Sequence, residues 1–259
     1  MSSVYFEFGR NETVNDIIEA SDNAESDVEV LRVVGPKAIT AGRSGRLLDS
    51  MMQTRDETIK LVQRLFSSKN SEPPQIVVFS GVESGSGCSW VCARVAETLA
   101  PQVEGSVCLI DANFHSNSTA RHFELGSLEK VPNERTLPPV FHKAQPPAGA
   151  GRLWLASFRQ PAGGWQTPGS LDRLRSRLSG MRKDFTVILI DAPPINTYAD
   201  AALLGRMSDG LVMILQANQT RLEAAQRAKE TLDAAGVPIL GAVLNKRTFP
   251  IPGFLYRRL

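Results

Sequence analysis

The sequence predicts an α/β fold: a three-layer, doubly wound, mostly parallel sheet that is flanked by helices. Short, uninterrupted apolar runs recur along the chain, which is typical of strands buried on both faces. Segments with apolar residues at helical spacing separate these runs. A chain of 259 residues is long enough to bury a large core in one such domain, and it contains no evident internal repeat.

The first elements in chain order lead up to a glycine-rich loop. Residues 1–40 are acidic and lack helical periodicity, so we expect a mobile arm. A helix is expected from Gly45 to Ser67, and Thr54 with Glu57 forms a capping box if this helix begins late. The run Ile76–Phe79 predicts the first buried strand, and Val91 to Leu99 has the apolar spacing of a helix after the loop.

Strands and helices then alternate to the end of the domain. The later predicted strands are Ser106–Asp111, Leu153–Phe158, Phe185–Asp191, Gly210–Leu215 and Leu240–Asn245. The later predicted helices run from an N-cap at Thr167 to about Met181, from Ala199 to Met207, and from a cap at Thr220 with Glu223 to Ala235. Residues 116–150 are rich in proline and are expected to form a long loop.

The composition restricts the possible classes of protein. Lys and Arg total 29 and Asp and Glu total 27, so no global charge favours a nucleic-acid partner. Three cysteines at irregular positions form no disulfide framework, which suits a reducing compartment. No apolar run approaches the roughly 20 residues of a membrane helix, and the polar N-terminus does not resemble a signal peptide. We therefore expect a cytoplasmic protein.

The glycine-rich loop has the composition of a phosphate-binding loop. Gly85, Ser86 and Gly87 carry almost no side chain and precede a helix, so their N–H groups can surround an anion at the positive end of the helix dipole. Such loops continue with Gly-Lys-[Ser/Thr]. In this chain Cys88 occupies the lysine position, whereas Ser89 keeps the hydroxyl. The main cation of the loop is absent.

Two carboxylates are expected beside this loop. Asp111 and Asp191 each end an apolar strand, and the carboxyl ends of parallel strands meet at one edge of a sheet. Asp191 and the Ser89 hydroxyl are candidate ligands of Mg²⁺, and Asp111 is the candidate catalytic base. The alternative for either aspartate is a helix cap or a turn residue.

At these motifs the sequence resembles the bacterial tyrosine kinases, cytoplasmic ATPases of capsule and exopolysaccharide synthesis that are related to the Min/Par ATPases. Ser80–Ser89 resembles their Walker A loop, Leu109–Asn113 a second Walker-type motif, and Val187–Pro194 the Walker B run. Gly241–Asn245 is similar to the strand whose asparagine faces the nucleotide base. The resemblance covers about residues 45–247.

The resemblance implies a P-loop NTPase type of fold and a site for ATP or ADP with Mg²⁺. Carried over residue by residue, the nucleotide-binding set is Gly85, Ser86, Gly87, Cys88, Ser89 and Asn245. A membrane-embedded polysaccharide co-polymerase or chain-length protein is the implied partner, and the implied location is the cytoplasmic side of the inner membrane. A homo-oligomer is also implied, although only Glu57, Lys60 and Gln63 stand where the family has a Glu-x-x-Arg-x-x-Arg contact helix.

The chain also departs from the family pattern. Cys88 replaces the loop lysine, Asn113 replaces the second aspartate of Asp-x-Asp, and His115 stands at a basic position. The family's autokinases end in a tyrosine cluster, whereas this chain has 3 tyrosines, of which only Tyr256 is near the end. Losing a cation on the transferring phosphates costs orders of magnitude in rate, because each ~1.4 kcal/mol is tenfold.

Three functions follow from this pattern. The first is a regulator or scaffold of exopolysaccharide synthesis with a degraded nucleotide site. The second is an active ATPase or autokinase that takes its cation from Lys246 or from a neighbouring subunit's arginine. The third is a Min/Par-like positioning ATPase, against which Glu83 at the signature-lysine position and Ala-Pro-Pro after Asp191 both argue.

Two features leave alternatives open. The helix dipole is expected to lower the pKa of Cys88, so a redox or metal role with Cys92 and His115 competes with a role as a small filler. The tail, residues 248–259, combines aromatic residues with two arginines. It either packs on the domain at residues 41–247 or anchors it to a partner or to the inner membrane.

Overall fold

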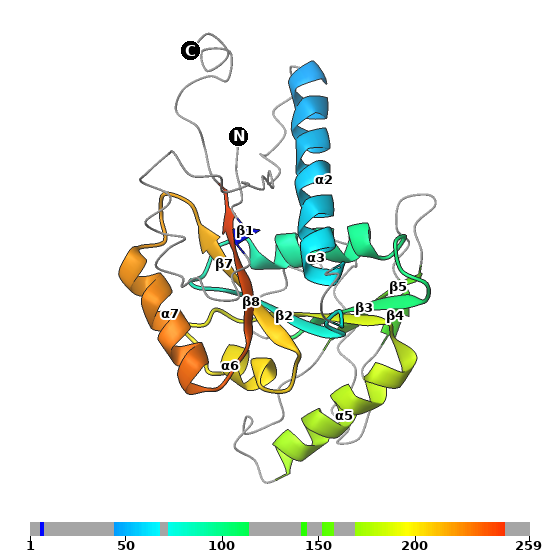
Figure 1. Ribbon diagram of the computed structural model, residues 1–259, viewed down its shortest axis with the longest axis vertical. Coiled ribbons are helices and arrows are strands. Elements are labelled where there is room, and N and C mark those ends of the chain that lie inside the picture. The colour runs from blue at the N-terminus through cyan, green and yellow to red at the C-terminus, as the bar shows by residue number, and fades with distance from the viewer. Residues whose placement is uncertain are drawn as a thin grey trace.

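The computed structural model describes residues 6–7, 44–67, 72–113, 141–143, 152–157 and 169–246. Its elements are β1 (Phe6–Glu7), α2 (Ser44–Phe66), β2 (Ile76–Gly81), α3 (Cys88–Leu99), β3 (Ser106–Asp111), β4 (Phe141–Lys143), β5 (Arg152–Ser157), α5 (Ser170–Asp184), β6 (Val187–Ala192), α6 (Asp200–Gly205), β7 (Gly210–Gln216), α7 (Leu222–Ala234) and β8 (Ile239–Asn245). Figure 1 shows a sheet with helices on both faces. None of the helices in these ranges combines the length and the apolar character that crossing a bilayer requires.

One sheet contains the eight strands in the order β1-β8-β7-β2-β6-β3-β5-β4. The six strands from β8 to β5 run parallel, while β1 and β4 pair antiparallel at the two edges. The predicted doubly wound, mostly parallel sheet is therefore confirmed. β2 lies between β7 and β6, so the loop that follows it emerges near the middle of the carboxyl edge.

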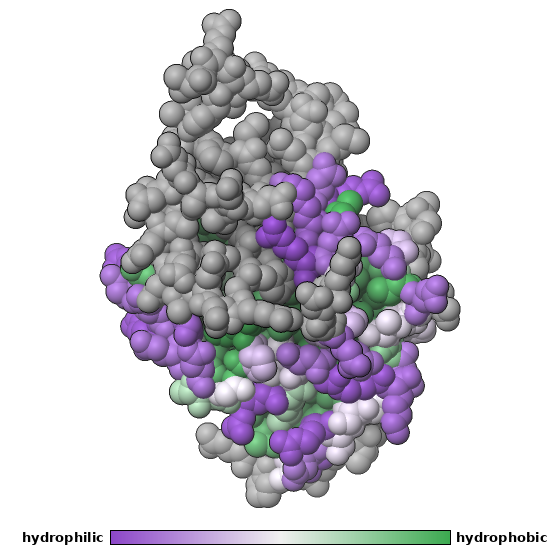
Figure 2. All heavy atoms as spheres, viewed as in Figure 1, coloured by the Kyte–Doolittle hydropathy of each residue, from purple (hydrophilic) through white to green (hydrophobic). Residues whose placement is uncertain are grey.

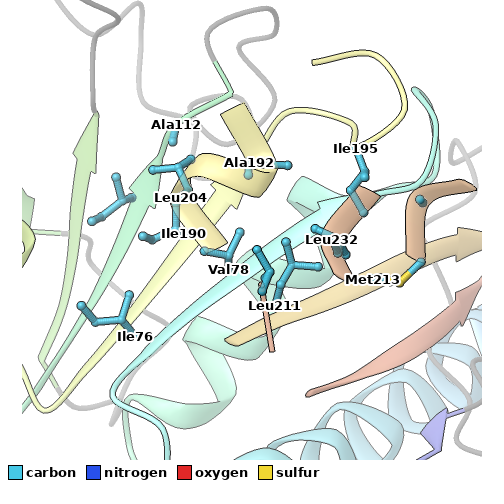
Figure 3. Packing of buried hydrophobic residues seen from close by; sticks show 14 of the residues in the cluster. Ile76, Val78, Ala112, Ile190, Ala192, Ile195, Leu204, Leu211, Met213 and Leu232 are labelled. Carbon is cyan, nitrogen blue, oxygen red and sulfur yellow. The ribbon is translucent and has the colours of Figure 1, made fainter. Parts of the chain in front are cut away.

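The continuous apolar runs of the strands serve two cores, one on each face of the sheet. Val77 and Phe79 point to the face covered by α2 and α3, and Ile76 and Val78 point to the face covered by α5, α6 and α7. Figure 3 shows the second core, in which Leu204 and Leu232 from the helices meet the strands. All of these side chains are essentially inaccessible to solvent, and each contributes about 1.5–3 kcal/mol of transfer free energy.

The outer surfaces of the helices are polar. In Figure 2, hydrophilic side chains cover most of the described surface over α5 and α7. Among the described residues, Leu171 and Leu222 are the exposed large hydrophobic side chains, and they lie on different helices. The described helices therefore have the amphipathic character that their periodicity predicts.

The amino edge of the sheet is fastened by a carboxylate that is fully paired. The carboxylate of Asp209 accepts hydrogen bonds from the N–H groups of Gln75 and Ile76, both at 2.8 Å, and pairs with Arg182 at 2.6 Å. Partial burial alone raises the pKa of Asp209, but the hydrogen bonds from Arg182 and the two N–H groups outweigh it and lower that pKa. Asp209 thus joins the start of β2 to the last turn of α5.

The predicted helix caps are wrong in each described case. α2 begins at Ser44, so Thr54 lies inside the helix. The N-cap of α5 is Gly169, in the left-handed region at φ 74°, instead of Thr167. The Thr220 hydroxyl accepts the N–H of Gln216 at 2.9 Å, which leaves Arg221 as the N-cap of α7 without a side-chain cap. Local sequence assigned Thr220 as a cap, but a contact within the preceding loop decides its partner.

Within residues 116–150, which are predicted to form a long loop, the structure describes the three-residue strand β4, which pairs with β5, and within the predicted arm it describes β1, which pairs with β8. The mobility of the arm, the site at His115 and the role of the tail at residues 248–259 lie outside the described residues and stay predictions.

Candidate functional site

The loop after β2 is tightly folded back on itself. A Cβ added at Gly81 would lie 2.2 Å from the Ser86 hydroxyl, so only glycine fits where the loop returns. The Ser80 hydroxyl donates to the carbonyl of Pro193 at 2.6 Å, and the N–H of Val82 donates to the carbonyl of Ile214 at 2.9 Å. These bonds fix the loop to the ends of β6 and β7.

The loop ends in a left-handed glycine that starts α3. Gly85 and Gly87 both have φ of 84°, a conformation that favours glycine. Gly87 is the N-cap of α3 and makes no side-chain cap hydrogen bond, so no side chain caps the first N–H groups of the helix. A Cβ at Gly87 would lie 2.4 Å from the Asn245 Nδ2. This geometry suits an anion at the helix N-terminus.

Two consecutive residues at the end of β8 hold two consecutive carbonyls of this loop. The buried Asn245 side chain donates from Nδ2 to the carbonyl of Ser86 at 2.8 Å, and its Oδ1 accepts the N–H of Lys246 at 2.9 Å. The ammonium of Lys246 donates to the carbonyl of Gly85. The sequence predicts that Asn245 faces a base, whereas the structure places its amide on the loop.

Asp111 and Asp191 lie side by side at the carboxyl edge. They are register partners on β3 and β6, and Asp191 also pairs with Phe79, which points to the α3 face. Burial, and then the charge of Asp191, raise the pKa of Asp111 to about 7, against a hydrogen bond from the N–H of Asn113 that lowers it. At pH 7 a carboxyl group with this pKa is about half protonated, whereas an ordinary carboxyl group is ionised.

The Cys88 thiol lies beside Asp191 and is neutral. Burial, then the charge of Asp191, the proximity of Cys92 and a hydrogen bond with Asp191 raise the pKa of Cys88. Burial, followed by Asp191 and Asp111, also raises the pKa of Cys92. The prediction that the helix dipole lowers the Cys88 pKa is wrong, because desolvation and nearby carboxylates dominate.

The group formed by Asp111, Asp191 and the two thiols carries net negative charge. The adjacent loop Gly85–Ser89 contains no lysine or arginine. Ser89 is half-buried in the first turn of α3, and the Asp191 carboxylate is 1% exposed. Such a pair of oxygen ligands fits Mg²⁺, which keeps most of its waters when a nucleotide shares its coordination. Among the described residues, no group of three or more His, Cys, Asp and Glu side chains is arranged to hold a metal by itself.

The structure therefore brings most of the predicted site together. The loop Gly85–Ser89, the two aspartates and Asn245 all lie at one edge, as their positions at the ends of strands predict. Sequence reasoning named Lys246 only as an alternative cation and missed its contact with the loop. The available signal was its place directly after the strand that ends in Asn245.

The chain is similar in sequence to bacterial tyrosine-protein kinases. No protein-family model matches the chain. Tyrosine-protein kinase CpsD of Streptococcus agalactiae is 35% identical over 69 residues, which is 27% of this chain and 30% of CpsD. Tyrosine-protein kinase YwqD of Bacillus subtilis is 38% identical over 61 residues, or 24% of this chain and 26% of YwqD.

A longer match covers most of the chain. CapB of Staphylococcus aureus, provisionally described as a tyrosine-protein kinase, is 26% identical over 187 residues, covering 70% of this chain and 79% of CapB. The chain is a homologue of bacterial tyrosine-protein kinases. The matches to the CpsD and YwqD kinases span less than a third of those proteins.

Solved structures establish the fold of this tyrosine-kinase homologue. The crystal structure of the chimerical protein CapA2B2 superposes with a TM-score of 0.62 at 18% identity, over 92% of this chain and all of that one. The kinase domain of the Escherichia coli tyrosine kinase ETK gives 0.56 at 20% identity, over 80% of each chain. Cobyrinic acid a,c-diamide synthase of Mycobacterium smegmatis, solved with a bound ATP analog and magnesium, gives 0.53 at 16% identity, over 65% of this chain and 73% of that one. The predicted P-loop NTPase type of fold is confirmed.

Proposed function

We propose that this tyrosine-kinase homologue is a regulator or scaffold of capsule or exopolysaccharide biosynthesis that binds ATP or ADP with Mg²⁺ and transfers phosphate slowly. The observation that carries the proposal is the thiol of Cys88. It stands at the lysine position of the loop and it is buried and neutral beside Asp191. A neutral thiol supplies no charge to the transferring phosphates.

Binding and catalysis respond differently to this change. The N–H groups of the loop and the start of α3 stay available to phosphate oxygens, so much of the binding free energy is kept. The transition state of phosphoryl transfer depends on fixed positive charge, which is worth several kcal/mol and hence several powers of ten in rate. We therefore expect nucleotide binding to outlast catalytic turnover.

The remaining groups have definite roles in this proposal. Gly85, Ser86 and Gly87 would hold the phosphates, and Ser89 and Asp191 would hold Mg²⁺. Bound Mg²⁺ supplies charge neutralisation on the phosphate oxygens. Asp111, whose pKa lies near 7, is suited to accept a proton from an attacking hydroxyl at neutral pH.

We also propose a location and a partner. The chain acts on the cytoplasmic side of the inner membrane, against a membrane-embedded polysaccharide co-polymerase or chain-length protein, and it forms homo-oligomers. The kinship with CpsD and CapB supports a place in the same systems. Co-purification of the full chain with that membrane protein, encoded nearby in the genome, tests this part.

Calorimetric titration with ATP–Mg²⁺ tests the central claim. The unmodified chain should bind weakly, and Cys88→Lys should bind at least tenfold more tightly and hydrolyse ATP at least a hundredfold faster, because an ammonium then faces the phosphates. Cys88→Ser, which is neutral and of similar size, is the matched control and should show neither gain. Equal behaviour of the lysine and serine variants, both folded by circular dichroism, contradicts a degraded site.

The position of Lys246 favours a second candidate, an active ATPase or autokinase with a relocated cation. Its ammonium already touches the loop at the carbonyl of Gly85. Incubation of the unmodified chain with radiolabelled ATP, read with an anti-phosphotyrosine antibody, separates the two candidates. Efficient labelling selects the active enzyme.

A further inference from the structure

We propose that Lys246 supplies the phosphate-contacting cation that the loop itself lacks. In the structure its ammonium is bound to the carbonyl of Gly85. With nucleotide bound, the ammonium moves from that carbonyl to the phosphate oxygens. This inference rests on the proposed nucleotide binding and names the residue on which that binding depends.

The side chain of Lys246 already lies along the loop. Its Cε is 3.4 Å from the position of a Cβ added at Gly87, and its Nζ binds the carbonyl of Gly85. The lysine side chain therefore passes over both left-handed glycines. These glycines enclose the anion position of a phosphate-binding loop. A small rotation about the lysine torsions therefore carries the ammonium to a bound phosphate.

The backbone at Lys246 is unusual in a way that fits this placement. Its φ of 61° is in the left-handed region, which a non-glycine residue rarely adopts. The N–H of Lys246 is held by Asn245 Oδ1 at 2.9 Å, and this bond fixes the turn directly after β8. The turn directs the side chain of Lys246 back to the loop. In an extended continuation of β8, the same side chain would point past the loop.

The present partner of the ammonium is weaker than a phosphate. Lys246 is exposed, and within the described part of the chain it makes no ion pair with a carboxylate. The carbonyl of Gly85 is a neutral acceptor, whereas a phosphate oxygen carries negative charge, so a phosphate adds ion–ion attraction to the hydrogen bond of the ammonium. Phosphate can therefore displace the carbonyl of Gly85.

The loop keeps its shape when the lysine leaves. The neighbouring bond from Asn245 to the carbonyl of Ser86 is buried, and it joins two neutral groups that do not compete for phosphate. The hydrogen bond from Asn245 to the loop is thus permanent, whereas the one from Lys246 can be exchanged for a phosphate. The N–H groups stay in position while the cation changes partners.

Calorimetry on the full chain tests the proposal, with ATP–Mg²⁺ and adenosine as ligands. Lys246→Met should weaken ATP–Mg²⁺ binding about tenfold or more and leave adenosine binding unchanged, whereas Lys246→Arg should keep most of the affinity. Lys183→Met is the control, because Lys183 is exposed next to Arg182 at the opposite edge of the sheet. In the double variant Cys88→Lys/Lys246→Met, the new ammonium should restore binding.

The outcomes separate this inference from the proposed function. If the folded, unmodified chain binds no ATP–Mg²⁺, both are overturned. If it binds, and Lys246→Met binds equally well, the proposed function stands and the role of Lys246 is overturned. Urea unfolding of each variant shows whether it is folded, and Lys246→Arg keeps the test decisive if the methionine variant is unstable.

Discussion

The two edges of the sheet place aspartates in opposite environments. At the amino edge, Asp209 is paired with Arg182 and two N–H groups, and its pKa is lowered. At the carboxyl edge, Asp111 lies beside Asp191 and two neutral thiols, and its pKa is raised to about 7. Both edges belong to the same sheet, so the difference comes from the partners of each aspartate.

The comparison shows that the paired aspartate stabilises the fold at neutral pH and that the aspartate with the raised pKa lies at the edge proposed to bind a ligand. A carboxylate whose pKa is lowered stabilises the folded state above the unfolded-state value of 3.8, and that contribution is lost as the pH falls. A carboxylate whose pKa is raised favours folding below 3.8, and that contribution is lost as the pH rises to about 7. At neutral pH the carboxyl edge is therefore under electrostatic strain that a cation can relieve.

The largest expected effect breaks the contrast at the amino edge. Asp209→Ala should lower the free energy of unfolding by about 2–3 kcal/mol at pH 7, because it leaves Arg182 and two N–H groups without their acceptor. Urea unfolding measures this. The control Asp233→Ala removes an exposed ion pair with Lys229 and should cost about 0.3–0.5 kcal/mol. Equal losses in the two variants would show that the Asp209 network is not stabilising.

A smaller effect sharpens the contrast at the carboxyl edge. Gly87→Ala should cost about 2 kcal/mol and abolish ATP–Mg²⁺ binding, because its Cβ would collide with Asn245 in addition to the left-handed strain. Calorimetry and urea unfolding measure the two effects. Gly169→Ala has the same left-handed strain but an ordinary contact of 3.7 Å, so about 1 kcal/mol and unchanged binding are expected. Normal nucleotide binding by Gly87→Ala would contradict the proposed loop.

The smallest expected effect is a gain in stability at the carboxyl edge. Asp111→Asn should raise the free energy of unfolding by about 1 kcal/mol at pH 8, because it removes one of two adjacent negative charges while keeping the acceptor for the N–H of Asn113. The gain should fade below pH 4, where Asp111 is protonated in both states. Urea unfolding across this pH range checks it, and a gain that is independent of pH would exclude the electrostatic cause.

Much of the fold is predictable from sequence because burial on both faces requires continuous apolar runs. The run that forms β3 is predicted with its observed bounds, Ser106–Asp111, and the other five parallel strands differ at their ends by one or two residues. β1 and β4 were missed, since edge strands of two or three residues depend on backbone pairing that leaves no apolar run.

The site was predictable in its membership but not in its contacts. Strands that end in Asp111, Asp191 and Asn245 had to meet at one edge of a parallel sheet. The state of Cys88 depends on burial against Asp191, and the direction of the Asn245 amide depends on how a distant loop packs on it. Sequence spacing contains no information about either contact.

The bonds from β8 to the loop join residues that are 159 and 161 positions apart. A ribosome that has released β2 and α3 must still synthesise the strands from β3 to β7 and their helices before β8, Asn245 and Lys246 emerge. The loop of the nascent chain therefore lacks its hydrogen bonds from Asn245 and Lys246 through most of the synthesis. Under the proposed function, we expect the loop to bind nucleotide only once the last described strand has docked, so that nucleotide binding would report on completed folding.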